Sequence, residues 1–170
     1  MVELKEQDYK YNKEKYLEME KVLHNMLGVD VPIDHVGSTA IPHMIGKNII
    51  DILVGAKDCE EFSRFREIIK GMGYYASPRS VTEIYQFFAS KEGETGEGDI
   101  HIHLVIMVTK RYKDFIVLRD YLLNNEVEAM AYANYKRELL NSGVTDRKEY
   151  RRIKGDYVTG LIERANKASK

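Results

Sequence analysis

Cysteine is nearly absent from this sequence of 170 residues, and neither sign of charge is in excess. The single cysteine, Cys59, cannot form an internal disulfide. We therefore predict a protein of the reducing cytoplasm in which Cys59 is a small buried residue. The 26 basic and 27 acidic residues give a formal net charge of −1. The chain thus lacks the positive field that nucleic-acid binding usually requires, and nucleic acid is not an expected partner.

Long apolar runs are also missing. None approaches the roughly 20 residues that cross a bilayer, and the sequence is charged from Glu3 onward, so we expect no membrane segment. The chain has no internal repeats and no linker rich in Pro, Gly or Ser. A chain of this length can bury roughly 70% of its unfolded surface in one core. We therefore predict a single domain over residues 1–170.

The apolar periodicity predicts an α/β (α+β) fold, in which a mixed β-sheet is flanked by helices and the C-terminal half is helical. Helical spacing covers residues 3–27, residues 58–71 and most of the chain after residue 109. Asn125 and Asp146 are expected to cap the later helices. Strands in one sheet are expected at about 31–36, 48–54, 73–77, 83–89 and 100–108.

Two breaks separate the later strands. Ser77-Pro78 is typical of a turn and should close a small hairpin. Residues 91–99 contain three glycines and four acids, which predicts a solvated loop. Beyond this loop, His101 and His103 should project from one face of the last strand because side chains alternate with a period of two.

The stretch from His35 to Val54 has the strongest functional signal. Gly37 has no side chain, so its backbone can approach a ligand closely, and Ser38 and Thr39 supply hydroxyl and N–H groups where a short helix begins. Backbone donors and the helix dipole favour an anion there, which predicts a phosphate-binding turn. The alternative is an ordinary strand-to-helix turn without a ligand.

Asp51 interrupts the apolar run 49–54, and an acid inside such a run needs a partner. It could be a structural acid paired with a basic group, or it could hold Mg²⁺, which takes carboxylate oxygens and substrate phosphates. His101 and His103 could ligate a metal, act as a general base, or be hydrogen-bonded core residues. His35, just before the turn, could likewise have a direct role in the site or be a hydrogen-bonded core residue.

These motifs resemble the GrpB family of the nucleotidyltransferase-fold superfamily. The resemblance is carried by His-Val-Gly-Ser-Thr-Ala-Ile-Pro from His35, by Lys47 and by Ile-Ile-Asp-Ile-Leu-Val up to Val54. The His-x-His pair and the Tyr-x-x-x-Lys of residues 150–154 extend it over most of the chain. The resemblance implies a nucleotidyltransferase-like domain that binds a nucleotide or another phosphorylated small molecule.

The resemblance also implies roles for single residues. Asp51 would hold Mg²⁺ and act in catalysis with His101 and His103. Lys47 and Lys154 would bind phosphate together with the turn of Gly37, Ser38 and Thr39.

The sequence departs from active nucleotidyltransferases at one position. Their strand carries Asp-x-Asp or Asp-x-Glu, and here Leu53 stands in place of the second acid. Two-metal transfer needs several carboxylates, which Asp99 or Glu83 would have to supply from other strands.

Two functions therefore stay open. One is Mg²⁺-dependent transfer of a nucleotidyl group to a small acceptor. The other is a catalytically inactive protein that binds a nucleotide or another phospholigand. The sequence names neither the acceptor nor the oligomeric state.

Overall fold

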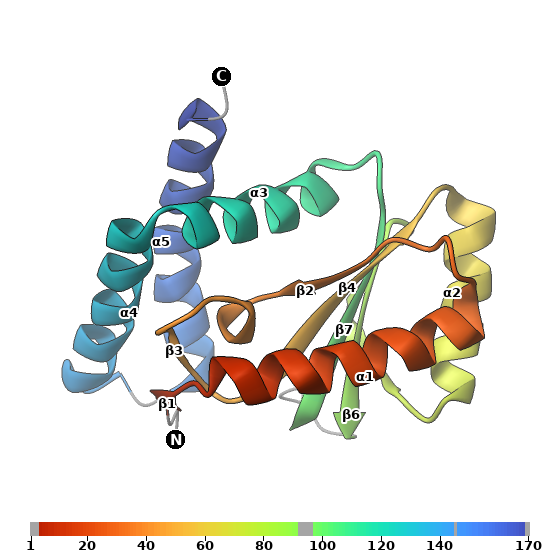
Figure 1. The fold of residues 1–170 in the computed structure, drawn as a ribbon, viewed down its shortest axis with the longest axis horizontal. Helices are drawn as coiled ribbons and strands as arrows, with labels where there is room; N and C mark the ends of the chain where they lie inside the picture. The colour runs from red at the N-terminus through yellow and green to blue at the C-terminus, as the bar shows by residue number, and fades with distance from the viewer. Residues whose placement is uncertain (1–3, 92–96, 145, 169–170) are drawn as a thin grey trace.

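The computed structural model describes residues 4–91, 97–144 and 146–168. Figure 1 shows its elements, which follow in the order β1 (Lys5–Glu6), α1 (Tyr9–Leu27), β2 (Ile33–Val36), the 3-10 turn η1 (Ser38–Ala40), β3 (Ile45–Gly46), β4 (Ile50–Ala56), α2 (Cys59–Gly71), β5 (Tyr75–Val81), β6 (Tyr85–Lys91), β7 (Glu97–Ile106), α3 (Lys110–Asn124), α4 (Glu126–Asn141) and α5 (Arg147–Ala168). None of the described helices is long and apolar enough to cross a membrane.

Five of the described strands form one mixed sheet in the order β2-β4-β7-β6-β5. The central strands β4 and β7 are parallel, and every other neighbouring pair is antiparallel. The parallel pair sets Asp51 opposite His101 and Leu53 opposite His103. The mixed sheet of five strands and the helical C-terminal half confirm the predicted fold class.

The two faces of the sheet carry different kinds of side chain. One face packs under α1 and α2, where the sheet contributes residues such as Ile52, Val54 and Leu104 to the largest apolar cluster. The opposite face carries Asp51 and its neighbours, and α3 covers it with Tyr112, Phe115 and Ile116. Asp51, His101 and His103 therefore share one face, as the alternation of side chains predicts.

The helical half has its own apolar cluster, built from η1, β3, α3, α4 and α5. In Figure 1, α4 and α5 stand beside η1 and β3 at one end of the sheet, and α3 runs from them along the sheet face. The short β1 pairs with β3 and so joins the N-terminus to this end. The turn that follows β2 is thus placed between the sheet and the helical half.

The hairpin turn lies later than predicted. β5 continues through Ser77-Pro78 to Val81, and the N–H of Thr82 donates to the carbonyl of Tyr85 at 2.8 Å. Proline is tolerated because β5 is the edge of the sheet, where a missing N–H breaks no ladder. Glu83, expected on a strand, is exposed in this turn.

Several other boundaries also differ from the predictions. The first helix begins at Tyr9 rather than residue 3, because Asp8 caps it by accepting from the N–H of Tyr11 at 3.0 Å. The strand β7 begins at Glu97 and ends at Ile106. Most of the predicted loop, residues 92–96, lies outside the described residues.

The predicted capping of the later helices is confirmed. The predicted burial of Cys59 is wrong. The carboxylates or amide oxygens of Asp58, Asn125 and Asp146 each accept a backbone N–H three residues on. Cys59 was expected to be buried, but it follows Asp58 in the first turn of α2 and is exposed.

Candidate functional site

A cleft of about 250 Å³ lies where the turn after β2 meets the sheet face, α3, α4 and α5. Its lining includes five of the residues predicted from the sequence, namely Gly37, Ser38, Asp51, His103 and Lys154. Three other predicted residues, Thr39, Lys47 and His101, are not part of the lining. Lys47 lies on the exposed segment after β3.

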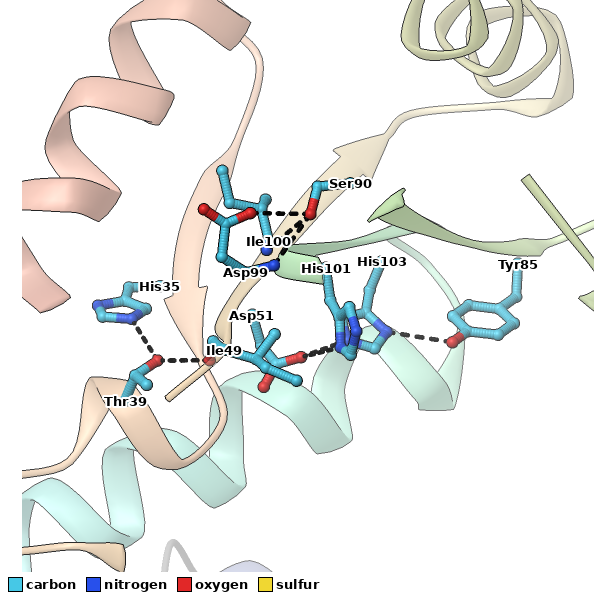
Figure 2. A network of polar contacts seen from close by, with 10 residues as sticks. All are labelled: His35, Thr39, Ile49, Asp51, Tyr85, Ser90, Asp99, Ile100, His101 and His103. Atoms are coloured by element: carbon cyan, nitrogen blue, oxygen red, sulfur yellow. Dashed lines mark hydrogen bonds and ion pairs between the residues drawn. The ribbon is translucent and has the colours of Figure 1, made fainter. Parts of the chain in front are cut away.

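Asp51 is held by two imidazoles from the neighbouring strand (Figure 2). Its Oδ1 lies 3.3 Å from Nδ1 of His101 and 3.2 Å from Nε2 of His103. A carboxylate can only accept, so both ring nitrogens must donate their N–H to Asp51. Nδ1 of His103 then accepts from the hydroxyl of Tyr85 at 3.1 Å.

The protonation states of this group follow from its surroundings. Removal from water alone would raise the pKa of Asp51, but the hydrogen bonds from His101 and His103 outweigh burial and hold this pKa below its ordinary value. Burial raises the pKa of Tyr85 to about 12, so its hydroxyl keeps the proton that it donates to His103. The result is an ionised carboxylate with its donors in place.

Gly37 allows the turn to pass directly over Asp51. Its φ is +73°, and a Cβ built on it would lie 2.4 Å from Oδ2 of Asp51. The glycine is thus needed both for its left-handed backbone and for close approach to the carboxylate. The short helix expected after it is only the 3-10 turn Ser38–Ala40, which is too short to add a helix dipole.

Thr39 is a buried structural residue in this turn. Its hydroxyl donates to the carbonyl of Ile49 at 3.2 Å and so must accept from Nε2 of His35, at 2.9 Å. His35 stacks on Tyr16 with ring centres 4.7 Å apart, and burial lowers the pKa of His35 to about 4. The hydrogen bonds that Thr39 makes with a neutral His35 and with the carbonyl of Ile49 hold the turn in place (Figure 2).

Two lysines approach the turn from the helical half. Lys154 lines the cleft, and burial lowers its pKa while the nearby charge of Asp51 acts in the opposite direction. The second is Lys136, which is only 2% exposed. Its Nζ donates to the hydroxyl of Ser38 at 3.1 Å and to the carbonyl of Ile45.

Sequence reasoning missed Lys136. On α4 the buried positions are Ala129, Tyr132, Ala133, Lys136 and Leu139. Lysine therefore stands on the apolar stripe of an amphipathic helix, at a spacing that should be buried. A charged residue on such a stripe needs a partner across the fold, and this was the available signal.

Lys136 has no carboxylate partner in the part of the chain that the structure describes. The ring of Tyr132 lies 4.6 Å from its Nζ. Burial, together with repulsion from Lys154 and Arg137, lowers the pKa of Lys136 to about 7. The other cation of the cleft, Arg119, is already paired with Asp34 at 2.6 Å.

The carboxylates at the cleft do not fit a magnesium site. Leu53 is fully buried under α3, the carboxylate of Asp99 accepts from Ser90 on the hairpin, and Glu83 is exposed in the turn. Among the described residues, no three or more His, Cys, Asp and Glu are grouped to hold a metal. Magnesium prefers several oxygen ligands, whereas Asp51 offers one carboxylate whose Oδ1 already accepts two N–H groups.

Solved structures define the class of fold. The chain matches conserved protein GrpB from Enterococcus faecalis with a TM-score of 0.82 at 20% identity, over 98% of this chain and 99% of that one. It matches Cid1, which has RNA terminal uridylyl transferase activity, with a TM-score of 0.55 at 13% identity, over 84% of this chain and 43% of that one. The fold is therefore nucleotidyltransferase-like.

Sequence comparison gives the family. The family model described as GrpB protein matches residues 1–164. The glutamate-rich protein GrpB of Alkalihalophilus pseudofirmus is 30% identical over 155 residues, which are 89% of this chain and 86% of that protein. A UPF0157 protein of Pseudomonas aeruginosa is 32% identical over 138 residues, which are 81% of this chain but 57% of that protein. The chain belongs to the GrpB family, as the resemblance predicted.

The contact between Gly37 and Asp51 can be tested with two glycines of similar backbone. Gly37→Ala should lower the free energy of unfolding by about 2 kcal/mol or more, through left-handed strain and the clash with Asp51. Gly143 has φ +87° with nothing within 4 Å of a built Cβ, so Gly143→Ala should lower it by about 1 kcal/mol. Urea denaturation measures both, and equal losses would contradict the close approach.

The burial of Lys136 predicts a pH dependence of stability. Its folded-state pKa of about 7 lies below the ordinary value of 10.5, so between these pH values the unfolded chain binds more protons. The free energy of unfolding should therefore rise with pH in this range, by up to about 1.4 kcal/mol per pH unit from this group. Denaturation at several pH values should show that Lys136→Met loses this rise, while Lys113→Met, at an exposed position on α3, keeps it. An unchanged slope in Lys136→Met would count against the buried charge.

Proposed function

We propose that this protein binds a phosphorylated small molecule, such as a nucleotide, in the cleft beside the Gly37-Ser38 turn. The phosphate would contact Ser38 and Lys154, with Lys136 behind Ser38. The observation that carries the proposal is the buried amine of Lys136, which is 2% exposed and has no carboxylate partner among the described residues, together with the half-buried Lys154 in the lining of the same cleft.

The energetics of burial support an anionic ligand. A charged amine removed from water costs free energy unless an opposite charge lies close by. Lys136 and Lys154 repel one another, and this repulsion contributes to the lowered pKa of Lys136. A phosphate at Ser38 would bring a negative charge close to Lys136, which has none among the described residues, and would add to that of Asp51 near Lys154.

The hydrogen bonds of Ser38 support the same assignment. Its oxygen accepts from Nζ of Lys136, so its own O–H is left to donate. Ser38 also lines the cleft, which suits donation to a phosphate oxygen. Lys136 is then a positioning residue that acts on the ligand through Ser38, and Lys154 is the direct cation.

Nucleotidyl transfer is the second candidate. It is favoured by the nucleotidyltransferase-like fold and by Asp51 and His103, which line the same cleft as Ser38 and Lys154. It needs carboxylates for Mg²⁺ that the described cleft residues do not supply. We therefore prefer the binding function, in which Asp51, held by His101 and His103, lies against the turn at Gly37. The proposed location, from the single cysteine, is the cytoplasm.

Thermal unfolding with added inorganic phosphate, AMP or ATP tests binding. A ligand that binds only the folded state raises the melting temperature by mass action, so at least one of these compounds should raise it. Lys154→Met and Ser38→Ala should reduce the shift strongly. Lys148→Met on the same helix and Ser63→Ala on α2, both at exposed positions, should keep it. The proposal fails if no phosphate compound stabilises the wild type, or if Lys154→Met responds like the wild type.

Pyrophosphate release separates binding from transfer. With nucleoside triphosphates, Mg²⁺ and a broad set of acceptors, the wild type should release no more pyrophosphate than Asp51→Asn. Both Asp51→Asn and His103→Ala should retain nucleotide affinity within a few-fold, since the contacts of Ser38 and Lys154 need no metal. Mg²⁺-dependent release that is lost in Asp51→Asn would instead establish the enzyme.

A further inference from the structure

The cleft has two walls of unlike chemistry. The turn and the sheet face contribute Ser38, Asp51 and His103, and α5 adds Lys154. The helical half contributes an apolar wall that continues into its own core cluster. This wall consists of Ile41, Met44, Leu118, Leu122, Tyr132 and Val158.

The size of the cleft limits its occupant. Its volume of about 250 Å³ is below the roughly 300–1,000 Å³ of a usual small-molecule pocket. A phosphate group and a compact body fill such a space. A triphosphate, a ribose and a base together would have to extend into solvent.

The apolar wall limits the polarity of that body. Ribose hydroxyls and the polar edge of a base lose hydrogen bonds with water when they are buried, and this is unfavourable unless the site replaces them. Apart from the hydroxyl of the buried Tyr132, the side chains of the wall offer no hydrogen-bond donor. Arg119, the remaining cation of the lining, already bonds Asp34 and Asp120. A hydrocarbon body satisfies this wall without any polar partner.

We propose that the ligand of this cleft is a compact phosphomonoester with an apolar body, whose phosphate lies at Ser38 and Lys154 and whose hydrocarbon part packs on the wall formed by α3, α4, α5 and the segment between η1 and β3. This inference rests on the proposed function and narrows it from phospholigands in general to one chemical class. Affinity should then increase with the apolar area that the ligand buries.

Isothermal titration calorimetry with four probes tests the inference. Phenyl phosphate and 3-methylbutyl phosphate should bind at least about tenfold more tightly than ribose 5-phosphate and inorganic phosphate, because only the first two gain from apolar burial. If ribose 5-phosphate binds as tightly as phenyl phosphate, the inference is overturned while the proposed function stands. If no phosphate compound binds, both are overturned.

One substitution can change the wall without touching the phosphate contacts. Val158→Thr keeps the shape of a half-buried lining residue but adds a hydroxyl. This substitution should weaken the binding of phenyl phosphate by about three- to tenfold and leave the affinity for inorganic phosphate unchanged. Val127→Thr, at a position 78% exposed on α4, is the control and should alter neither. Equal weakening of both probes by Val158→Thr would mean that the substitution disturbs the phosphate contacts, and it would contradict the assignment of this wall to the ligand body.

Discussion

The buried amine of Lys136 joins the two halves of this fold. From α4 it reaches Ser38 in the turn after β2 and the carbonyl of Ile45 in β3. These bonds satisfy donors of the amine, but they do not balance its charge, and a buried charge without a counter-ion costs several kcal/mol. A chain that retains such a residue loses stability when empty and regains it when an anion binds nearby.

Asp51 does not balance the charge of Lys136, with which it forms no ion pair, although its charge does act on Lys154. His101 and His103 both donate to Oδ1, and Gly37 crosses above the carboxylate with no room for a side chain. The acid is therefore fixed beneath Gly37, while Lys136 stays buried without a carboxylate partner among the described residues. This distribution favours a role in binding an anion over a role in holding a metal.

Local patterns in the sequence predicted the sheet and the shared face of Asp51 and the histidines, whereas Lys154 was singled out by the resemblance to the GrpB family. Alternation along a strand and helical spacing need only short windows. Lys136 was missed because its partner Ser38 lies 98 residues away, and no local pattern records that contact. The turn at Thr82 was missed because tolerance of Pro78 depends on β5 being an edge strand, which only the strand order reveals.

The central proposal is that an anion binds beside Lys136 and Lys154 at the Gly37-Ser38 turn. The most direct measurement is an NMR pH titration of the lysine side-chain ¹³Cε signals, with and without saturating phosphate. A bound anion stabilises nearby charged amines, so the midpoints of Lys136 and Lys154 should move to higher pH while that of Lys148 stays. Unchanged midpoints for both, or equal shifts of all three, would contradict the account.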